Sequence, residues 1–242
     1  MERSGGAFTV KGMPLQITGS HRQKLFIVLV YIVMIAGGIW HALGMFEKIR
    51  ALLATPLLIF LTGLLVFETL HQYIKQKDPV QTRKMIIWCL GIFFPGLIVE
   101  WLGVKSGKIF GHYQYGQILQ PQLDAVPIAI GFAWLLSVIG AVGCAQQILG
   151  DRYYQKKARF LTASVLMLVL FDFFMEPAAI ELGYWSWLEG TIPLQNYFAW
   201  FFIGGILVLC GDRLGLFQKR YSPLACHFYI AQVLYFGLIW LF

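Results

Sequence analysis

The sequence predicts an all-α, polytopic membrane protein with seven transmembrane helices. Three observations support this fold class. The 242 residues are 58% hydrophobic and only 13% charged, and their mean hydropathy is strongly positive. The apolar residues gather in stretches of about 20, the length that crosses a bilayer as a helix. Almost no sequence remains between these stretches, so an ordinary soluble globule is excluded.

Seven apolar stretches follow one another along the chain. They cover residues 25–44, 51–71, 85–104, 126–149, 160–180, 194–211 and 223–242. The first is too long for a signal-peptide core and lacks a convincing cleavage site, so we assign it to the mature protein. Residues 1–24 are predicted to form a cytoplasmic N-terminal segment, and residues 25–242 one seven-helix transmembrane domain.

The basic residues predict the orientation of the bundle. Fifteen Lys and Arg residues precede the first stretch or follow the second, fourth and sixth, whereas four follow the first and third. The positive-inside rule therefore places the N-terminus in the cytoplasm and the C-terminus outside. The net charge of +7 accordingly indicates topology and affinity for anionic lipid headgroups, and no nucleic-acid partner is expected. We expect a multi-pass protein of the cell's inner membrane.

Acidic residues inside apolar stretches are the first functional signal, because they are costly in lipid and usually mark a site or pathway. Asp172 and Glu176 lie four residues apart in the fifth stretch, so they share one helix face. Glu100 lies near the end of the third stretch and Asp124 near the start of the fourth. All four are placed in the outer half of the membrane. The alternative is that these acids only fix the bundle by hydrogen bonding between helices.

Two loops rich in glycine and aromatic residues accompany the acids. They contain the segments GHYQYG and GYWSW, whose aromatic residues suit either a site wall or an interfacial belt. These residues are Tyr113, Tyr115, Tyr184, Trp185 and Trp187. The composition of the first loop also predicts a folded lid.

Each aromatic loop is followed by a similar helix start. VPIAIGFAW ends at Trp134 and IPLQNYFAW ends at Trp200, with the same interval from proline to tryptophan. This similarity indicates a parallel repeat, in which the third and fourth helices correspond to the fifth and sixth. Proline near a helix start is also common for backbone reasons alone.

The remaining polar residues of the stretches are interpreted as structural. We expect His41 to be a core histidine with one backbone partner, and Glu68 to be a residue of the cytoplasmic boundary, where it is solvated. The four cysteines have no C-x-x-C spacing and are interpreted as small buried hydrophobes. They are Cys89, Cys144, Cys210 and Cys226.

Several absences narrow the chemistry. No G-x-G-x-x-G motif is present, no histidines have the spacing of a membrane di-iron site, and the last stretch has no lysine for a retinal Schiff base. A second Asp-rich motif, which a membrane prenyltransferase needs, is also missing. The sequence therefore favours acid–base chemistry without a cofactor or a metal.

The sequence resembles the family of carotenoid biosynthesis membrane proteins that includes the carotenoid 1,2-hydratases. FGHYQY, VPIAIGFAW, DFFMEPAAIELGYWSW and IPLQNYFAW carry the resemblance, which covers roughly residues 100–200 and more loosely all seven stretches. Many relatives have Asp-Pro where this chain has Glu176-Pro177, a change that keeps the acid. The matching positions are Gly111, Tyr113, Tyr115, Pro127, Trp134, Asp172, Pro177, Gly183, Tyr184, Trp185, Trp187, Pro193, Asn196 and Trp200.

The resemblance implies a cofactor-independent hydratase that adds water to the terminal C1′,C2′ double bond of an acyclic carotenoid end group, of the gamma-carotene or lycopene type. Asp172 or Glu176 is the candidate acid, because a buried carboxyl group stays protonated at neutral pH. Glu100 or the other member of the pair would take a proton from the attacking water, which Asn196 would orient. The aromatic faces would stabilise a tertiary cation and bind substrate, together with Asp124.

The implied partners are a long polyene carotenoid, the lipid bilayer and other carotenoid enzymes. Two other functions remain open. A membrane carotenoid cyclase would protonate the same end group but capture the cation with an internal double bond. A carotenoid-binding or transport protein would need the aromatic residues but not the paired acids, although a transporter normally needs a polar path on both sides of the membrane.

Overall fold

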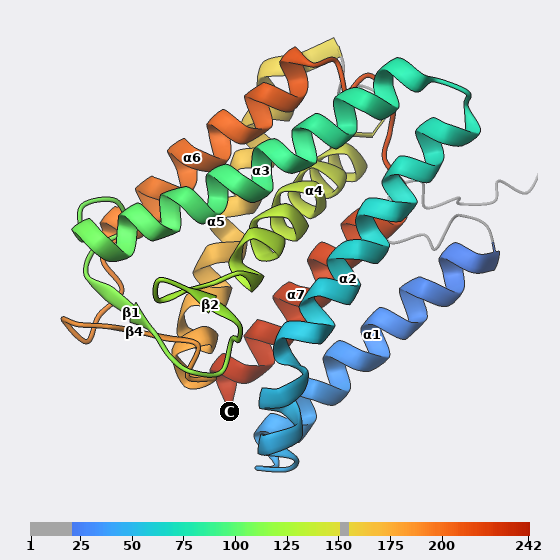
Figure 1. Ribbon diagram of the computed structural model, residues 1–242. Coiled ribbons are helices and arrows are strands. Elements are labelled where there is room, and N and C mark those ends of the chain that lie inside the picture. Colours follow the sequence, from blue (N-terminus) through green and yellow to red (C-terminus); the bar gives the residue numbers. More distant parts are fainter. Residues whose placement is uncertain (1–20, 151–154) are drawn as a thin grey trace, which may run out of the picture.

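The computed structural model describes residues 21–150 and 155–242, which form a bundle of seven helices (Figure 1). The helices are α1 (His21–Ala42), α2 (Glu47–Lys75), α3 (Pro79–Ser106), α4 (Ala129–Leu149), α5 (Lys157–Glu181), α6 (Leu194–Arg213) and α7 (Pro223–Leu241). Each is long and apolar enough to cross a membrane. The predicted all-α membrane fold is therefore confirmed. Residues 1–20 of the predicted N-terminal segment lie outside the described residues, and residues 21–24 belong to α1.

Local sequence sets where several helices begin and end. The Asp78 carboxylate accepts a hydrogen bond from the Gln81 backbone N–H at 3.1 Å, and Pro79 follows as the first residue of α3. Two residues after the end of α5, Gly183 adopts a left-handed conformation with φ 68°. This glycine stops the helix and turns the chain into the aromatic loop.

The α4 helix occupies the centre of the bundle, where it packs against α2, α3, α5 and α7 (Figure 1). Its small residues allow this burial, because glycine lets two helix backbones approach closely. A Cβ atom on Gly143 would lie 2.4 Å from the Ala225 Cβ of α7, and one on Gly140 would lie 3.2 Å from the Tyr229 Cβ. The centre of the fold is thus an α4–α7 contact without space for larger side chains.

Four short strands lie at one end of the bundle, here called the strand end. They are β1 (Tyr113–Tyr115), β2 (Gln122–Leu123), β3 (Val126–Pro127) and β4 (Trp185–Trp187). β1 pairs antiparallel with β4, so the α3–α4 connection is joined to the α5–α6 connection. β2 and β3 form a hairpin whose turn residues, Asp124 and Ala125, both have positive φ. These strands cover the end of the bundle (Figure 1), as expected for a folded lid.

The interpretations of Cys210 and Glu68 were wrong. Cys210 is exposed on α6, whereas the other three cysteines are buried, because position 210 lies on the face of α6 turned away from the bundle. Glu68 is not solvated but buried, with its carboxylate paired to the Arg22 guanidinium at 2.8 Å. The orientation of the bundle and the parallel repeat stay predictions.

Candidate active site

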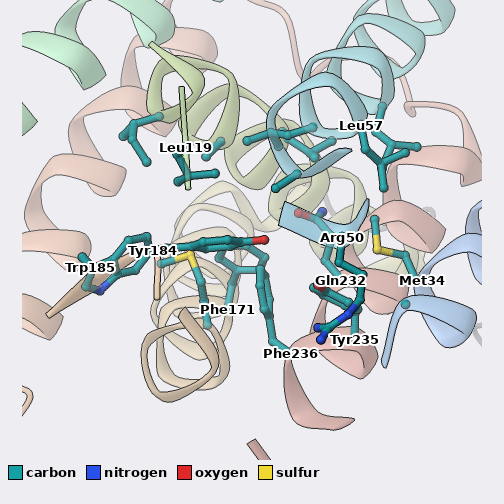
Figure 2. A pocket seen from close by; sticks show the side chains of 18 of the residues that line it. Met34, Arg50, Leu57, Leu119, Phe171, Tyr184, Trp185, Gln232, Tyr235 and Phe236 are labelled. Atoms are coloured by element: carbon teal, nitrogen blue, oxygen red, sulfur yellow. The ribbon is translucent and has the colours of Figure 1, made fainter. Parts of the chain in front are cut away.

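A cavity of about 720 Å³ lies inside the strand end of the bundle and extends between α1, α2 and α7. Figure 2 shows it from close by, with Trp185 and Met34 at opposite sides. Ten of the twelve residues predicted for the site line this cavity. They are Glu100, Tyr113, Tyr115, Trp134, Glu176, Tyr184, Trp185, Trp187, Asn196 and Trp200. Asp172 lies behind the wall, and Asp124 lies elsewhere.

Glu176 is held in the cavity wall by hydrogen-bond donors. The indole N–H groups of Trp185 and Trp187 donate to its Oε2 atom at 3.0 and 2.9 Å. Both tryptophans belong to β4, where residues two apart point to the same face of the strand. The two donors favour negative charge on this carboxyl group.

Asp172 is fully buried one turn before Glu176 on α5. The Asn196 side chain bridges the two acids: its Nδ2 atom donates to Asp172 Oδ2 at 2.7 Å and to Glu176 Oε1 at 3.4 Å. The Asp172 Oδ1 atom is buried with no hydrogen-bond partner among the described residues. Since two neighbouring buried carboxylates repel each other strongly, this arrangement suits a pair that holds at least one proton.

Glu100 of α3 is a third buried carboxyl group, and it receives three donors. The hydroxyl groups of Tyr113 and Tyr115 donate to Oε2 at 2.6 and 2.7 Å, and the Trp134 indole donates to Oε1 at 2.9 Å. Burial, and then the charge of Glu100, raises the pKa of both tyrosines well above the usual range, so they remain donors. A carboxyl group that only accepts hydrogen bonds fits the ionised form.

Glu100 and Glu176 therefore have related surroundings. Each receives two donors from alternate residues of one strand, β1 for Glu100 and β4 for Glu176, and these strands pair with each other. The indoles of Trp134 and Trp200 stack between α4 and α6, with ring centroids 4.1 Å apart. The lid and the helices thus join two acid sites into one aromatic-walled chamber.

Asp124 does not reach this chamber. Its carboxylate is exposed in the β2–β3 turn, where Trp101 Nε1 donates to it at 2.7 Å and Lys105 Nζ pairs with it at 2.9 Å. These two contacts lower the pKa of Asp124 below its usual value. The sequence places Asp124 near a helix start, but α4 begins only at Ala129, and the intervening hairpin turns the acid outward.

The opposite side of the cavity was not predicted from the sequence. There Arg50, Gln232 and Tyr235 line the wall among apolar residues of α1 and α2 (Figure 2). Gln232 is a polar residue inside an apolar stretch, which is the signal that could have found it. His41 was expected to have a backbone partner, but its Nδ1 atom instead accepts a hydrogen bond from Arg50 Nη1 at 2.9 Å.

Comparison with known proteins found a family model and a curated relative that match the chain. The family model described as carotenoid biosynthesis protein matches residues 54–242. Bisanhydrobacterioruberin hydratase of Haloarcula japonica is 30% identical over 151 residues, which are 59% of this chain and 50% of that relative. The chain thus spans about half the length of the curated relative it matches. No solved structure matches the chain.

Proposed function

The chain belongs to the family of carotenoid biosynthesis proteins, and from this premise we propose that it is a carotenoid 1,2-hydratase. The proposed reaction adds water to the terminal C1′,C2′ double bond of an acyclic end group, giving a tertiary alcohol. The observation that carries the proposal is the acid pair Asp172–Glu176, bridged by Asn196 at the wall of an aromatic cavity. The similarity to a bisanhydrobacterioruberin hydratase supports the reaction class.

In the first step, Glu176 gives its proton to the less substituted alkene carbon. Glu176 suits this role because it lines the cavity, whereas Asp172 lies behind it. As the proton leaves, the indoles of Trp185 and Trp187 stabilise the negative charge that develops on Oε2. Asp172 then returns a proton to Glu176 through the side-chain hydrogen bond between the two carboxyl groups, while the Asn196 amide holds them together.

In the second step, water attacks the tertiary cation. The stacked faces of Trp134 and Trp200 stand in the cavity wall and stabilise the positive charge. Glu100 takes the proton that the attacking water loses, because its Oε1 atom accepts only the Trp134 donor and has room for another. The proton that Glu100 takes up then returns through cavity water to the acid pair, so the protein regains its starting state. Over the whole turnover one alkene and one water give one alcohol, with no cofactor.

The proposed function also implies a substrate, a membrane location and partner enzymes. The apolar part of the cavity accepts the polyene chain of a lycopene- or gamma-carotene-type substrate. We place the protein in the inner membrane with the strand end outside, on the basis of the positive-inside rule. Other carotenoid enzymes would supply the substrate and use the product.

Expression in a bacterium that accumulates lycopene or gamma-carotene tests the proposal. We expect a product heavier by one water, detected by chromatography and mass spectrometry. Glu176→Gln and Asp172→Asn should reduce its formation by about 10²-fold or more, the scale of a lost general acid. The matched control is Asp124→Asn, which removes an acid outside the cavity and should keep the activity.

Other outcomes point to other functions. A product of unchanged mass with a new ring would show cyclisation instead of hydration. Unchanged pigment that stays bound to wild-type protein and to Asp172→Asn alike would show a carotenoid-binding protein.

A further inference from the structure

We propose that the water consumed by the reaction enters along a row of polar residues at the α1–α2–α7 side of the cavity. This row, here called the polar file, consists of Glu181, His41, Arg50, Tyr235 and Tyr184. The inference rests on the proposed hydration, since only that reaction needs a molecule of water in each turnover. It gives a role to residues that the acid–base mechanism does not use.

On the lid side, aromatic donors already occupy the acids. Asp172, Glu176 and Glu100 are all buried. The Oε2 atoms of Glu100 and Glu176 each accept two hydrogen bonds from aromatic residues of the lid, in β1 and β4 respectively. The cavity is therefore the route for water that we consider.

Most of the cavity wall away from the acids is apolar. Among the described residues that line it, Arg50 carries the only charge other than Glu100 and Glu176. Gln232 and Tyr235 of α7 line the same side, and Gln232 is buried with its amide nitrogen bonded to Phe228 O at 3.2 Å. Figure 2 shows Arg50, Gln232 and Tyr235 close together in view, across the cavity from Trp185. Polar groups on an apolar wall are the places where passing water finds partners.

This polar group is linked to the surface at the strand end. Arg50 donates to His41 Nδ1 at 2.9 Å, and the other ring nitrogen of His41 lies 4.0 Å from the Glu181 carboxylate. The Glu181 side chain is 62% exposed, whereas that of His41 is 12% exposed. The file thus runs from an exposed acid, through a mostly buried imidazole ring, to a guanidinium group in the cavity wall.

Two tyrosines continue the file toward the acids. The hydroxyl groups of Tyr235 and Tyr184 interact by a side-chain hydrogen bond. Burial raises the pKa of Tyr184 well above its usual value, so the Tyr184 hydroxyl keeps its proton. The Tyr184 ring lies next to Trp185, with centroids 6.3 Å apart, and the Trp185 indole donates to Glu176. Water that enters at Arg50 therefore has polar partners along the way to the reacting carbon.

The test measures what happens to the cation after protonation. In D₂O, the acid delivers a deuteron to the alkene. The cation then either captures water, giving the alcohol, or loses a neighbouring proton, giving back an alkene that carries deuterium. Mass spectrometry of the recovered substrate and the alcohol gives the ratio of exchange to hydration. A change in the fold alone would lower both products together.

We expect Arg50→Leu and Tyr235→Phe each to raise the ratio of exchange to hydration by about tenfold, the rate equivalent of one hydrogen bond. Arg50→Lys should restore most of the wild-type ratio. The matched control is Arg22→Gln, because Arg22 also joins α1 to α2, through Glu68, but at the far end from the strands. This control should leave the ratio unchanged.

Three results would overturn the inference. The ratio could stay at the wild-type value in both Arg50→Leu and Tyr235→Phe. It could rise as much in Arg22→Gln, which would show an effect of helix packing. Arg50→Leu could raise only the KM for the carotenoid, which would show that the file binds substrate. If wild-type protein forms no alcohol at all, the proposed function fails, and the inference fails with it.

Discussion

At the scale of single residues, the three buried carboxyl groups of the site differ in the hydrogen-bond donors around them. Glu100 and Glu176 each accept three hydrogen bonds from neighbouring side chains. Asp172 accepts one from Asn196, and its Oδ1 atom has no partner among the described residues. Similar side chains in different surroundings can thus have different protonation states and different roles. For this reason we assign the resting proton of the α5 pair to Asp172, its delivery to Glu176, which lines the cavity, and the base to Glu100, which has no neighbouring acid on its own helix.

The indole donors allow a test of the acid assignment. Trp187→Phe keeps an aromatic face but removes the N–H that donates to Glu176 at 2.9 Å. We expect kcat to fall by about 10²-fold, as when one donor to a developing anion is lost. The control is Trp101→Phe, which removes an indole donor to the exposed Asp124 and should leave kcat unchanged. Equal losses in the two variants would contradict the role of the indole N–H.

The sequence revealed most of the acids and aromatic residues because buried charge and tryptophan clusters are unusual in apolar helices. It did not reveal which helix faces meet. Arg50 and Gln232 therefore escaped notice, and Asp124 was placed near the substrate although its hairpin turns it outward. Side-chain positions of this kind depend on packing between distant elements, which hydropathy does not specify.

At the scale of elements, the β1–β4 pair decides the shape of the site. Hydropathy predicted the helices well, but strands of three residues leave no clear alternation in a sequence. Their pairing places Tyr113 opposite Trp187 and Tyr115 opposite Trp185, so the donors of two acids form one surface. The lid therefore positions the acids as well as covering them.

A substitution at Gly116, which lies close to the Gly183 backbone, tests the importance of the β1–β4 pairing. A Cβ atom there would lie 2.2 Å from the Gly183 carbonyl oxygen, so Gly116→Ala must push the two connections apart. We expect a loss of about 1–3 kcal/mol in stability, the usual cost of overpacking, and a lower kcat. Thermal unfolding in detergent measures the first effect. Gly63→Ala is the control, because a Cβ atom at Gly63 meets nothing within 4 Å.

At the scale of the whole molecule, the orientation is a prediction that labelling can check. Glu189 is exposed at the strand end, and Gln218 is exposed at the opposite end. In a chain whose four cysteines are replaced by alanine, we expect a membrane-impermeant thiol reagent on intact cells to label Glu189→Cys but not Gln218→Cys. Labelling of Gln218→Cys alone would reverse the orientation.

The central position of α4 has a consequence for how the protein is made. Two of its neighbours, α5 and α7, are synthesised after it. Until they arrive, the small residues that will contact α7, such as Gly140 and Gly143, have no helix to pack against. Assembly of the bundle therefore waits for the last helix to leave the ribosome. A chain cut short before α7 would present an unfinished α4 surface to the insertion machinery and to membrane proteases.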